Sequence, residues 1–228
     1  MFALIIAGGE GARLRPYTDD RPKPMIEIAG RPILDYQVTW LVGQGISDIA
    51  LLCGYKAEVI KDYFGTGDKW GVRIHYSLER EPLGRGGALR QAYSGLSLQG
   101  QPVVALNGDT LFGQALKPVI AFHRRKNAIA TVILSPLSSP YGIVRVSRAG
   151  AISSFVEKPL LPHWVNSGAY ILSPEFFDRL PERGDHETAT FPQLAREGKL
   201  FGYRSKAYWR PIDTVKDIRE AERELGQI

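Results

Sequence analysis

Residues 2–25 read FALIIAGGEGARLRPYTDDRPKPM, and this stretch decides the fold class. It opens with an unbroken apolar run, residues 2–7, which is the pattern of a strand buried on both faces of a parallel sheet. Gly8, Gly9 and Gly11 follow at once. Because glycine has no Cβ, backbone N–H groups in such a turn can approach an anion closely, and ligands of open α/β sheets bind at the carboxyl ends of strands. The stretch predicts an α/β protein with a phosphate-binding loop after its first strand.

Two cations accompany this loop. Arg13 lies within it, and Lys23 follows ten residues later between Pro22 and Pro24, which restrict the backbone around it. The loop is not a dinucleotide-binding fingerprint, because Leu14 stands where the third glycine would be, and no Lys-Ser or Lys-Thr pair follows to make a triphosphatase loop. We predict a phosphate cradle of another kind; the alternative is a glycine turn that carries surface charges.

The rest of the chain alternates strand-like and helix-like segments without a polar linker or a repeat. We expect strands at residues 48–53, 73–77 and 102–107, and helices at 33–44, 57–64, 86–96 and 116–126. Four successive strands are expected at 129–135, 142–146, 152–157 and 165–172, then helices at 174–180 and 188–197, short strands at 200–204 and 208–212, and a helix from Val215. The four successive strands indicate a mixed sheet. We predict one α/β domain over residues 1–228, with a Rossmann-like, mostly parallel sheet flanked by helices.

The composition narrows the function classes. A net charge of +5 favours anionic partners, but the basic residues are dispersed and carry no nucleic-acid signature, so we expect no nucleic-acid binding. Cys53 is the single cysteine and the four histidines are isolated, which argues against a disulfide or a zinc cluster. The apolar run at residues 2–7 is too short to cross a membrane. We expect a cytoplasmic protein that does not bind a membrane.

Two further charged residues follow predicted strands. Asp109 comes after residues 102–107, so its carboxylate is placed at the same sheet edge as the glycine loop, where it is suited to holding Mg²⁺ against phosphate oxygens. A tight hairpin turn before Asp109 is the less favoured alternative, because the preceding run does not alternate and a helix is expected to follow. Lys158 follows residues 152–157 and either binds a second phosphate or belongs to a surface turn.

The motif G-G-x-G-x-R-L-x-P-x-T at residues 8–18, followed by P-K-P-M at 22–25, resembles the signature of the sugar nucleotidyltransferases. Further segments fall in that family's order: residues 25–36 (MIEIAGRPILDY), 83–88 (LGRGGA), 107–109 (NGD), 141–142 (YG), 157–159 (EKP) and 166–168 (NSG). The resemblance covers nearly the whole chain. It implies a glycosyltransferase-A-like fold and an enzyme that joins a sugar 1-phosphate to a nucleoside triphosphate, releases pyrophosphate and uses Mg²⁺.

The resemblance also implies roles for individual residues. The catalytic residues would be Arg13, Lys23 and Asp109. Nucleotide contacts would come from Gly8, Gly9, Gly11, Leu83, Gly84 and Gly87, and sugar-phosphate contacts from Gly142, Glu157, Lys158 and Asn166. The metal ligands would be Asp109 and Asp213.

Asp213 departs from the commoner family pattern Trp-x-Asp-x-Gly-Thr. This chain has Pro211 at the carboxylate position and Asp213 at the glycine position, an arrangement that resembles the cytidylyltransferases. Asp213 could itself cap the helix that follows it. If Thr214 and Asp217 form the cap instead, Asp213 is free to join Asp109 at the metal.

The base and the sugar are less well determined. Residues 83–88 are most similar to the mannose and heptose 1-phosphate guanylyltransferases, although Arg85 replaces a small residue, whereas residues 187–213 are closer to the glucose-1-phosphate cytidylyltransferases. We favour GTP with mannose or heptose 1-phosphate. CTP, UTP or dTTP with glucose 1-phosphate, and a non-catalytic regulatory paralogue that binds sugar nucleotides, remain as alternatives. The sequence does not determine the oligomeric state, and a homo-oligomer is one of the alternatives.

Overall fold

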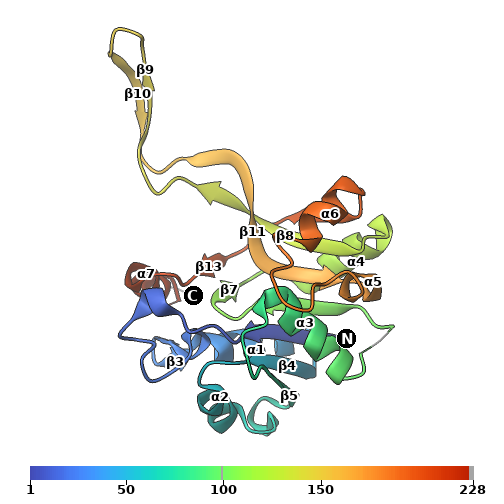
Figure 1. The fold of residues 1–228 in the computed structure, drawn as a ribbon. Coiled ribbons are helices and arrows are strands. Elements are labelled where there is room, and N and C mark those ends of the chain that lie inside the picture. The colour runs from blue at the N-terminus through green and yellow to red at the C-terminus, as the bar shows by residue number, and fades with distance from the viewer. Residues whose placement is uncertain (99, 226–228) are drawn as a thin grey trace.

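The computed structural model describes residues 1–98 and 100–225, and its centre is a seven-stranded sheet in the order β12-β8-β11-β6-β1-β4-β5 (Figure 1). Strands β6, β1, β4 and β5 are parallel neighbours, β11 runs antiparallel to β6 and β8, and β12 runs parallel to β8. The strands are β1 (Phe2–Ala7), β4 (Asp48–Cys53), β5 (Arg73–Leu78), β6 (Val103–Asn107), β8 (Ala130–Ser138), β11 (Leu160–Leu172) and β12 (Leu200–Arg204). The predicted mixed, mostly parallel sheet is confirmed.

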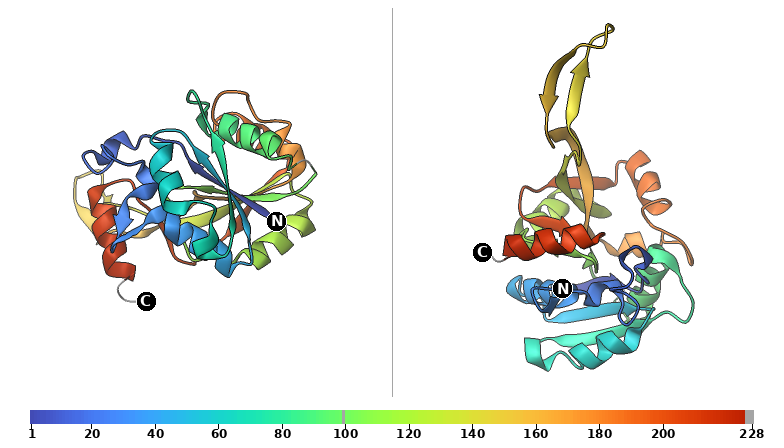
Figure 2. Two further views of the ribbon diagram at one scale, coloured as in Figure 1. Left: turned by 90° about the horizontal axis from the view of Figure 1, so that it is seen from below. Right: turned by 90° about the vertical axis from the view of Figure 1, so that its left-hand side faces the viewer.

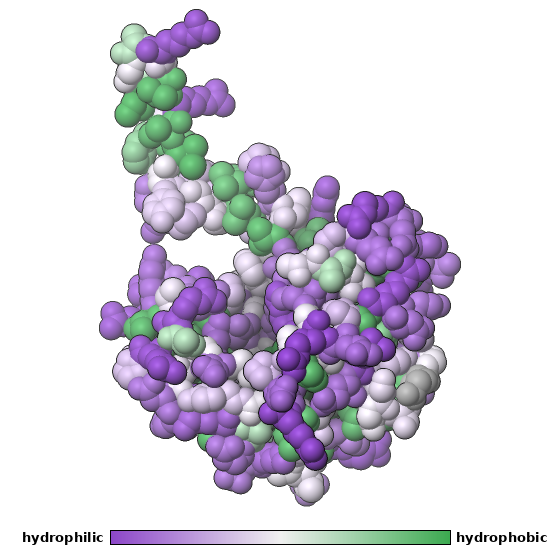
Figure 3. All heavy atoms as spheres, viewed as in Figure 1, coloured by the Kyte–Doolittle hydropathy of each residue, from purple (hydrophilic) through white to green (hydrophobic). Residues whose placement is uncertain are grey.

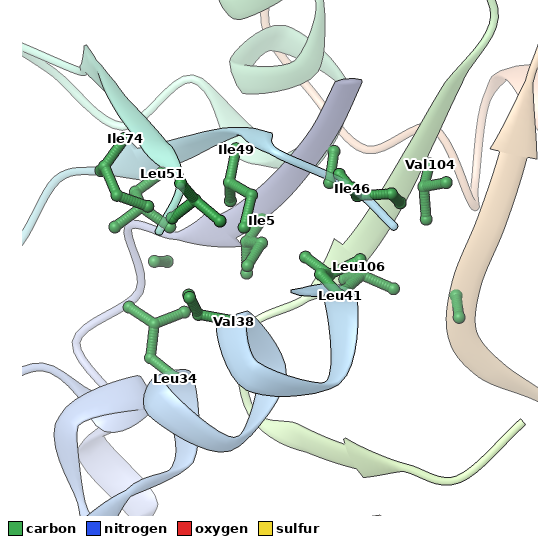
Figure 4. Packing of buried hydrophobic residues seen from close by; sticks show 14 of the residues in the cluster. Ile5, Leu34, Val38, Leu41, Ile46, Ile49, Leu51, Ile74, Val104 and Leu106 are labelled. Carbon is green, nitrogen blue, oxygen red and sulfur yellow. The ribbon is translucent and has the colours of Figure 1, made fainter. Parts of the chain in front are cut away.

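Helices cover both faces of the sheet. Alternate residues of β1 point in opposite directions, so that Ile5 packs with the layer of α1, α2 and α4, and Leu4 packs with the layer of α3, α5 and α6. Figure 4 shows the first layer, where Leu34 and Val38 of α1 lie against Ile5. Burial on both faces explains why β1 is apolar throughout. The helices are α1 (Ile33–Gly43), α2 (Ala57–Phe64), α3 (Gly84–Gly95), α4 (Leu116–Lys126), α5 (Pro174–Phe177) and α6 (Thr190–Arg196).

A third apolar cluster joins segments that are far apart in the sequence. Leu14 from the glycine loop and Ile28 pack with Ile212 and with Ile218 of α7 (Val215–Leu225). Two-stranded ladders lie nearby: β2 (Glu27–Ile28) with β3 (Arg31–Pro32), and β7 (Thr110–Phe112) with β13 (Trp209–Pro211). This cluster brings the C-terminal segment to the carboxyl end of β1.

Two of the predicted strands do not belong to the sheet. β9 (Ile143–Val146) and β10 (Ile152–Val156) form a separate antiparallel hairpin that projects from the body (Figures 1 and 2). The ends of β8 and β11 carry it, so β11 begins at Leu160 instead of residue 165. All four predicted strands are present and the sheet is mixed, but two of these strands, β9 and β10, lie outside it. Apolar alternation indicates that a strand has a face to bury, but not which surface buries it.

Smaller differences concern element ends. A short strand that we did not predict, β7, lies between Asp109 and the expected helix α4, and it pairs with β13 instead of folding back on β6. Helix α5 ends at Phe177 and α6 spans residues 190–196, so both are shorter than predicted. Along residues 1–98 and 100–225, no helix has the length and apolar character needed to cross a bilayer.

Candidate active site

Four predicted site residues meet beside the glycine loop. The Lys23 Nζ donates to Asp109 Oδ2 at 2.6 Å and to Asp213 Oδ1 at 2.9 Å, and Arg13 Nη2 donates to the same Asp213 oxygen at 2.9 Å. The side chain of Lys23 is 11% exposed, whereas that of Arg13 is 78% exposed. Lys23 is therefore a fixed charge between two carboxylates, and Arg13 reaches out into solvent beside them.

The glycine loop holds Lys23 in place. Pro22 and Pro24 set a short 3-10 helix (Lys23–Met25), closed by a bond from the Met25 N–H to the Pro22 carbonyl at 2.8 Å. Gly11 has φ +66°, and a Cβ on it would lie 2.7 Å from the Cβ of Lys23. Glycine at position 11 thus allows the loop backbone to approach the lysine stem.

Asp109 is positioned from the sheet and from α1. The N–H of Gly108 donates to the Ile6 carbonyl at 2.9 Å, and a Cβ on Gly108 would lie 2.5 Å from that oxygen. Gln37 of α1 donates to the carbonyls of Asn107 and Thr110 at 2.8 and 2.6 Å. The turn is fixed at both ends and leads into β7, so the hairpin alternative for this turn is wrong.

The cap of α7 leaves Asp213 free. Asp217 Oδ2 accepts hydrogen bonds from the Thr214 N–H at 2.7 Å, the Thr214 hydroxyl at 2.8 Å and the Asp213 N–H at 3.0 Å. Thr214 and Asp217 therefore form the cap, and the carboxylate of Asp213 binds Lys23 and Arg13 instead. A bond from the Ile212 N–H to the Asp109 carbonyl, at 3.0 Å, ties the two acidic segments together.

Two adjoining cavities open at this edge of the sheet. One, of about 190 Å³, is lined by Gly9, Gly11, Lys23 and Asp109, and the other, of about 360 Å³, by Gly8, Tyr55, Glu79 and Gly84. Gly9 and Arg85 line both. A larger cavity of about 450 Å³ lies beside Tyr17, but it is an open recess in which Arg21 is already paired with Asp20 and Glu27. The joined pair of cavities is the better candidate site.

Glu79 lies in the second cavity and was not singled out from the sequence. Its Oε2 accepts a hydrogen bond from the Leu83 N–H at 2.7 Å, and its Oε1 lies so close to the loop that a Cβ on Gly8 would be 2.7 Å away. Burial raises the pKa of Glu79, and the Leu83 N–H opposes that shift. The available signal was its place directly after β5, at the carboxyl end of a parallel strand.

The glycines of residues 84–87 pack against another loop. A Cβ on Gly84 would lie 2.6 Å from the Gly184 carbonyl oxygen, and one on Gly87 would lie 2.5 Å from the Glu182 carbonyl oxygen. Leu83 and Gly87 are not among the residues that line the two cavities, and Leu83 acts through its N–H, which orients Glu79. Of these three predicted nucleotide contacts, Gly84 alone faces a cavity.

Arg85 links the cavities to Asn166. Its guanidinium donates to Asp185 Oδ2 and, from Nη1, to Glu187 Oε1 at 2.8 Å. The same Glu187 oxygen accepts from the Tyr170 hydroxyl at 2.8 Å and from Asn166 Nδ2 at 2.9 Å. Asn166, predicted to contact the sugar, is thus held by Glu187. Sequence reasoning noticed Arg85 but missed its partners, which lie about one hundred residues away.

The other three predicted sugar-phosphate residues lie at the foot of the hairpin. Gly142 and Glu157 are neighbours, since a Cβ on Gly142 would lie 2.9 Å from Glu157 Oε2. Lys158 follows with φ +45°. Within the part of the chain that the structure describes, the side chains of Glu157 and Lys158 form no ion pair, and neither residue lines the two cavities. The structure does not bring them to Lys23 and Asp109.

Asp109 and Asp213 could bind Mg²⁺ together with phosphate oxygens and waters, but they do not form a complete metal site by themselves. Among the described residues there is no group of three or more His, Cys, Asp or Glu side chains that could hold a metal. Asp109 and Asp213 nevertheless share a cation, the Lys23 ammonium, and Mg²⁺ at nucleotide sites commonly takes only one or two carboxylates together with phosphate oxygens and waters. These two side chains are the ones that could bind it.

Residues 2–228 match the family profile described as Nucleotidyl transferase. The chain belongs to the nucleotidyl transferase family. A mannose-1-phosphate guanyltransferase of Yarrowia lipolytica is 36% identical over 226 residues, which are 96% of this chain and 62% of that protein. A mannose-1-phosphate guanyltransferase beta-B of Xenopus laevis is 35% identical over 225 residues and is covered to the same 62%. This nucleotidyltransferase chain therefore spans about three fifths of the length of these relatives.

Solved structures show the same fold. HddC from Yersinia pseudotuberculosis matches with a TM-score of 0.78 at 28% identity, over 98% of this chain and 99% of HddC. A putative glucose-1-phosphate thymidylyltransferase from Bacillus anthracis matches with a TM-score of 0.80 at 20% identity, over 100% and 96% of the two chains. The family predicted from residues 8–25 is confirmed, and so is the nucleotidyltransferase fold.

Proposed function

We propose that this protein is a cytoplasmic sugar-1-phosphate guanylyltransferase, which forms a GDP-sugar and pyrophosphate from GTP and mannose or heptose 1-phosphate. One observation carries the proposal: Lys23, which is bonded to Asp213, and Asp109 line a cavity that adjoins a second cavity containing the carboxylate of Glu79. The first supplies groups for phosphates and the second a group for a base. The names of the Yarrowia lipolytica and Xenopus laevis relatives support the same substrates.

The reaction follows from these charges. A phosphate oxygen of the sugar 1-phosphate attacks the α-phosphorus in line, a new P–O bond forms, and the bond to the β-phosphate oxygen breaks to release pyrophosphate. Lys23, Arg13 and the backbone amides of the glycine loop neutralise the charge that gathers on the leaving group. Mg²⁺ held by Asp109 and Asp213 would supply additional positive charge. The attacking phosphate is already ionised at pH 7, so positioning and electrostatics suffice without a protein nucleophile.

Guanine fits Glu79 better than uracil, thymine or cytosine. Its N1–H and N2–H₂ groups lie on one edge and can both donate to a carboxylate, which only accepts hydrogen bonds. Uracil and thymine offer a single N–H group between two carbonyl oxygens. Those oxygens are acceptors, so the carboxylate of Glu79 repels them. Cytosine offers one amino group and is the second choice. HddC, whose structure has also been solved with GMP-PN, supports a guanine nucleotide at this fold.

The test is a pyrophosphate-release screen that crosses GTP, CTP, UTP and dTTP with a panel of sugar 1-phosphates. We expect GTP to be preferred, and Glu79→Gln to lower kcat/KM for GTP about 100-fold, the loss of a charge-assisted hydrogen bond. Glu81→Gln is the matched control, because Glu81 lines the same cavity but is paired with Arg183 in solvent. A preference for CTP, or an equal effect of both variants, would reject Glu79 as the guanine ligand. Binding of a GDP-sugar without turnover would favour a regulatory paralogue.

A further inference from the structure

Tyr55 contacts the glycine loop, residues 8–18, at its first and at its last residue. The backbone N–H of Tyr55 donates to the Gly8 carbonyl at 3.1 Å, and its hydroxyl donates to the Thr18 carbonyl at 3.2 Å. Tyr55 itself lies between β4 and α2, in a segment separate from the loop. A single residue from outside the loop therefore holds both of its ends.

The backbone around Tyr55 is closely fitted to the start of the loop. A Cβ on Gly54 would lie 2.9 Å from the Gly8 carbonyl oxygen, so glycine at position 54 allows the two segments to approach. On the other side of Tyr55, Lys56 has φ +48° and directly precedes α2. The strand before this segment and the helix after it thus fix where Tyr55 meets the loop.

The end of the loop is connected to the turn that carries Arg13. Thr18 is 1% exposed, and its hydroxyl donates to the Gly11 carbonyl at 3.1 Å. The same carbonyl accepts from the Leu14 N–H at 2.9 Å, which closes the short 3-10 turn that contains Arg13. A contact that holds Thr18 therefore also supports the turn from which Arg13 reaches its partner.

Tyr55 also lines the second cavity, in which Glu79 lies. We propose that Tyr55 is a positioning residue, which couples the presence of a base in that cavity to the conformation of the glycine loop. A base that fills the cavity restricts the Tyr55 side chain, which keeps its hydroxyl on the Thr18 carbonyl and so holds Arg13 in place. The coupling is reciprocal, because a loop held in this conformation also favours the bound base. The inference rests on the proposed function for the place of the base.

A second tyrosine shows what is particular about this contact. The Tyr76 hydroxyl donates to the Gly65 carbonyl at 2.7 Å, which is the usual length for such a bond, and Tyr76 is not among the residues that line the two cavities. The bond from Tyr55 to Thr18 is longer, at 3.2 Å. It can therefore shorten when the Tyr55 side chain is restricted, whereas the Tyr76 bond cannot gain in this way.

The test measures how readily the loop opens in the full chain. Trypsin can cleave the loop only after Arg13, because Arg15 is followed by Pro16 and residues 8–18 contain no other Lys or Arg. Cleavage needs local opening, so the rate at which peptide 1–13 appears in mass spectra reports the open fraction of the loop. Arg148, in the turn between β9 and β10, is the internal reference, because that hairpin stands clear of the body (Figure 3).

Guanosine, cytidine, uridine and thymidine supply a base without phosphates. We expect guanosine to slow cleavage after Arg13 about 5-fold in the wild type, at the low end of ordinary couplings, and to have no such effect in Tyr55→Phe. Without a nucleoside, Tyr55→Phe should be cleaved about 3–10-fold faster than the wild type, which is the effect of one hydrogen bond. Tyr76→Phe loses an equivalent hydroxyl and is the matched control, in which cleavage after Arg13 should match the wild type.

Steady-state kinetics give a second readout. Tyr55→Phe should lower kcat with GTP about 3–10-fold and leave the KM for the sugar 1-phosphate unchanged, because the loop acts on the leaving group. Circular dichroism checks that each variant is folded.

The outcomes separate the coupling from the proposed function. Guanosine protection that persists in Tyr55→Phe, an equal loss of kcat in Tyr76→Phe, or a wild type that no nucleoside protects would overturn the coupling, even if GTP is turned over. Protection by cytidine instead of guanosine, abolished by Tyr55→Phe, would support the coupling and reject guanine as the base. Protection in a chain that turns over no nucleotide would support the coupling and reject the enzyme.

Discussion

Replacing His186 with phenylalanine should make the fold less sensitive to acid. His186 is fully buried, and its ring meets Tyr170, Phe176 and Phe191 edge to face. Both ring nitrogens lack a hydrogen-bond partner. Burial lowers the pKa of His186 from 6.5 to about 4, although the nearby carboxylates of Glu187 and Asp185 oppose the shift. The native state therefore holds this imidazole in its neutral form.

The sign and the size of the effect follow from that pKa. Above pH 6.5 neither the folded nor the unfolded chain binds a proton at His186. Protonation of this residue therefore does not lower the free energy of unfolding there. As the pH falls from 6.5 towards 4, the unfolded chain binds a proton at His186 and the folded chain does not. The free energy of unfolding therefore falls by up to about 1.4 kcal/mol per pH unit. Between pH 7 and pH 5 the loss from this one group is about 2 kcal/mol.

The assay is thermal and urea unfolding of the wild type and His186→Phe at pH 7, 6 and 5. Phenylalanine fits an aromatic surrounding and does not titrate, so the stability difference in its favour should grow by about 2 kcal/mol from pH 7 to pH 5. In Tm that is about 4–8 °C for a chain of this size. A pH-independent difference between the two proteins would refute the reasoning.

His123 provides the control. Its ring nitrogens lie 2.9 Å from the hydroxyls of Thr131 and Ser173, and burial lowers its pKa as well. His123→Phe removes those hydrogen bonds and leaves two hydroxyls without that partner, so it should cost about 1–3 kcal/mol already at pH 7. Comparing the two variants distinguishes the effect of replacing His123, whose ring is hydrogen-bonded, from that of replacing His186, whose ring nitrogens have no hydrogen-bond partner.

Five variants test the site. Gly11→Ala should add about 1–2 kcal/mol of backbone strain at φ +66° and displace Lys23, so turnover falls at least about 10-fold; wild-type pyrophosphate release would remove the packing role of Gly11. Lys23→Met should lower kcat by about 10²–10³ in a folded protein, and an unchanged kcat would exclude Lys23 from leaving-group stabilisation. Asp213→Asn should raise the Mg²⁺ concentration for half-maximal activity at an unchanged Tm, whereas Thr214→Ala should lose a cap worth about 1 kcal/mol; a normal metal response in the first would make Asp213 a bystander. Arg85→Met should raise the KM for the sugar 1-phosphate more than that for GTP, because it releases Glu187 from one of its partners, and equal changes in both would contradict that role.

Local signals in the sequence located the sheet and the phosphate loop. The apolar run Phe2–Ala7, the glycines after it and the proline-flanked Lys23 each depend on neighbours in the sequence, and the structure has them as predicted. The meeting of Lys23 with Asp109 followed from one topological rule, that parallel strands end at one sheet edge. The place of Asp213 followed from the cap formed by its neighbours.

The remaining features depend on contacts that a single sequence does not reveal. Glu187 is an ordinary loop carboxylate until Arg85 and Asn166 pack beside it from segments 102 and 21 residues away. The hairpin of β9 and β10 has the apolar alternation of a buried strand, and nothing local distinguishes a strand buried in its own domain from one that projects. The glycines at 84 and 87 indicated an approach to a base, but their close neighbours are the carbonyls of residues 184 and 182.

The pairing of Arg13 with Asp213 bears on how the protein acquires its activity during folding. These residues are 200 positions apart, and Lys23 and Asp213 are 190 apart, so the charge cluster closes a loop of nearly the whole chain. The entropy of closing a loop grows only slowly with its length, but long-range contacts form late. The sheet and the glycine loop can therefore assemble while Lys23 still lacks its second carboxylate. Docking of α7 through Ile212 and Ile218 is the step that completes the cluster, so recovery of turnover should lag behind recovery of secondary structure when the denatured chain refolds.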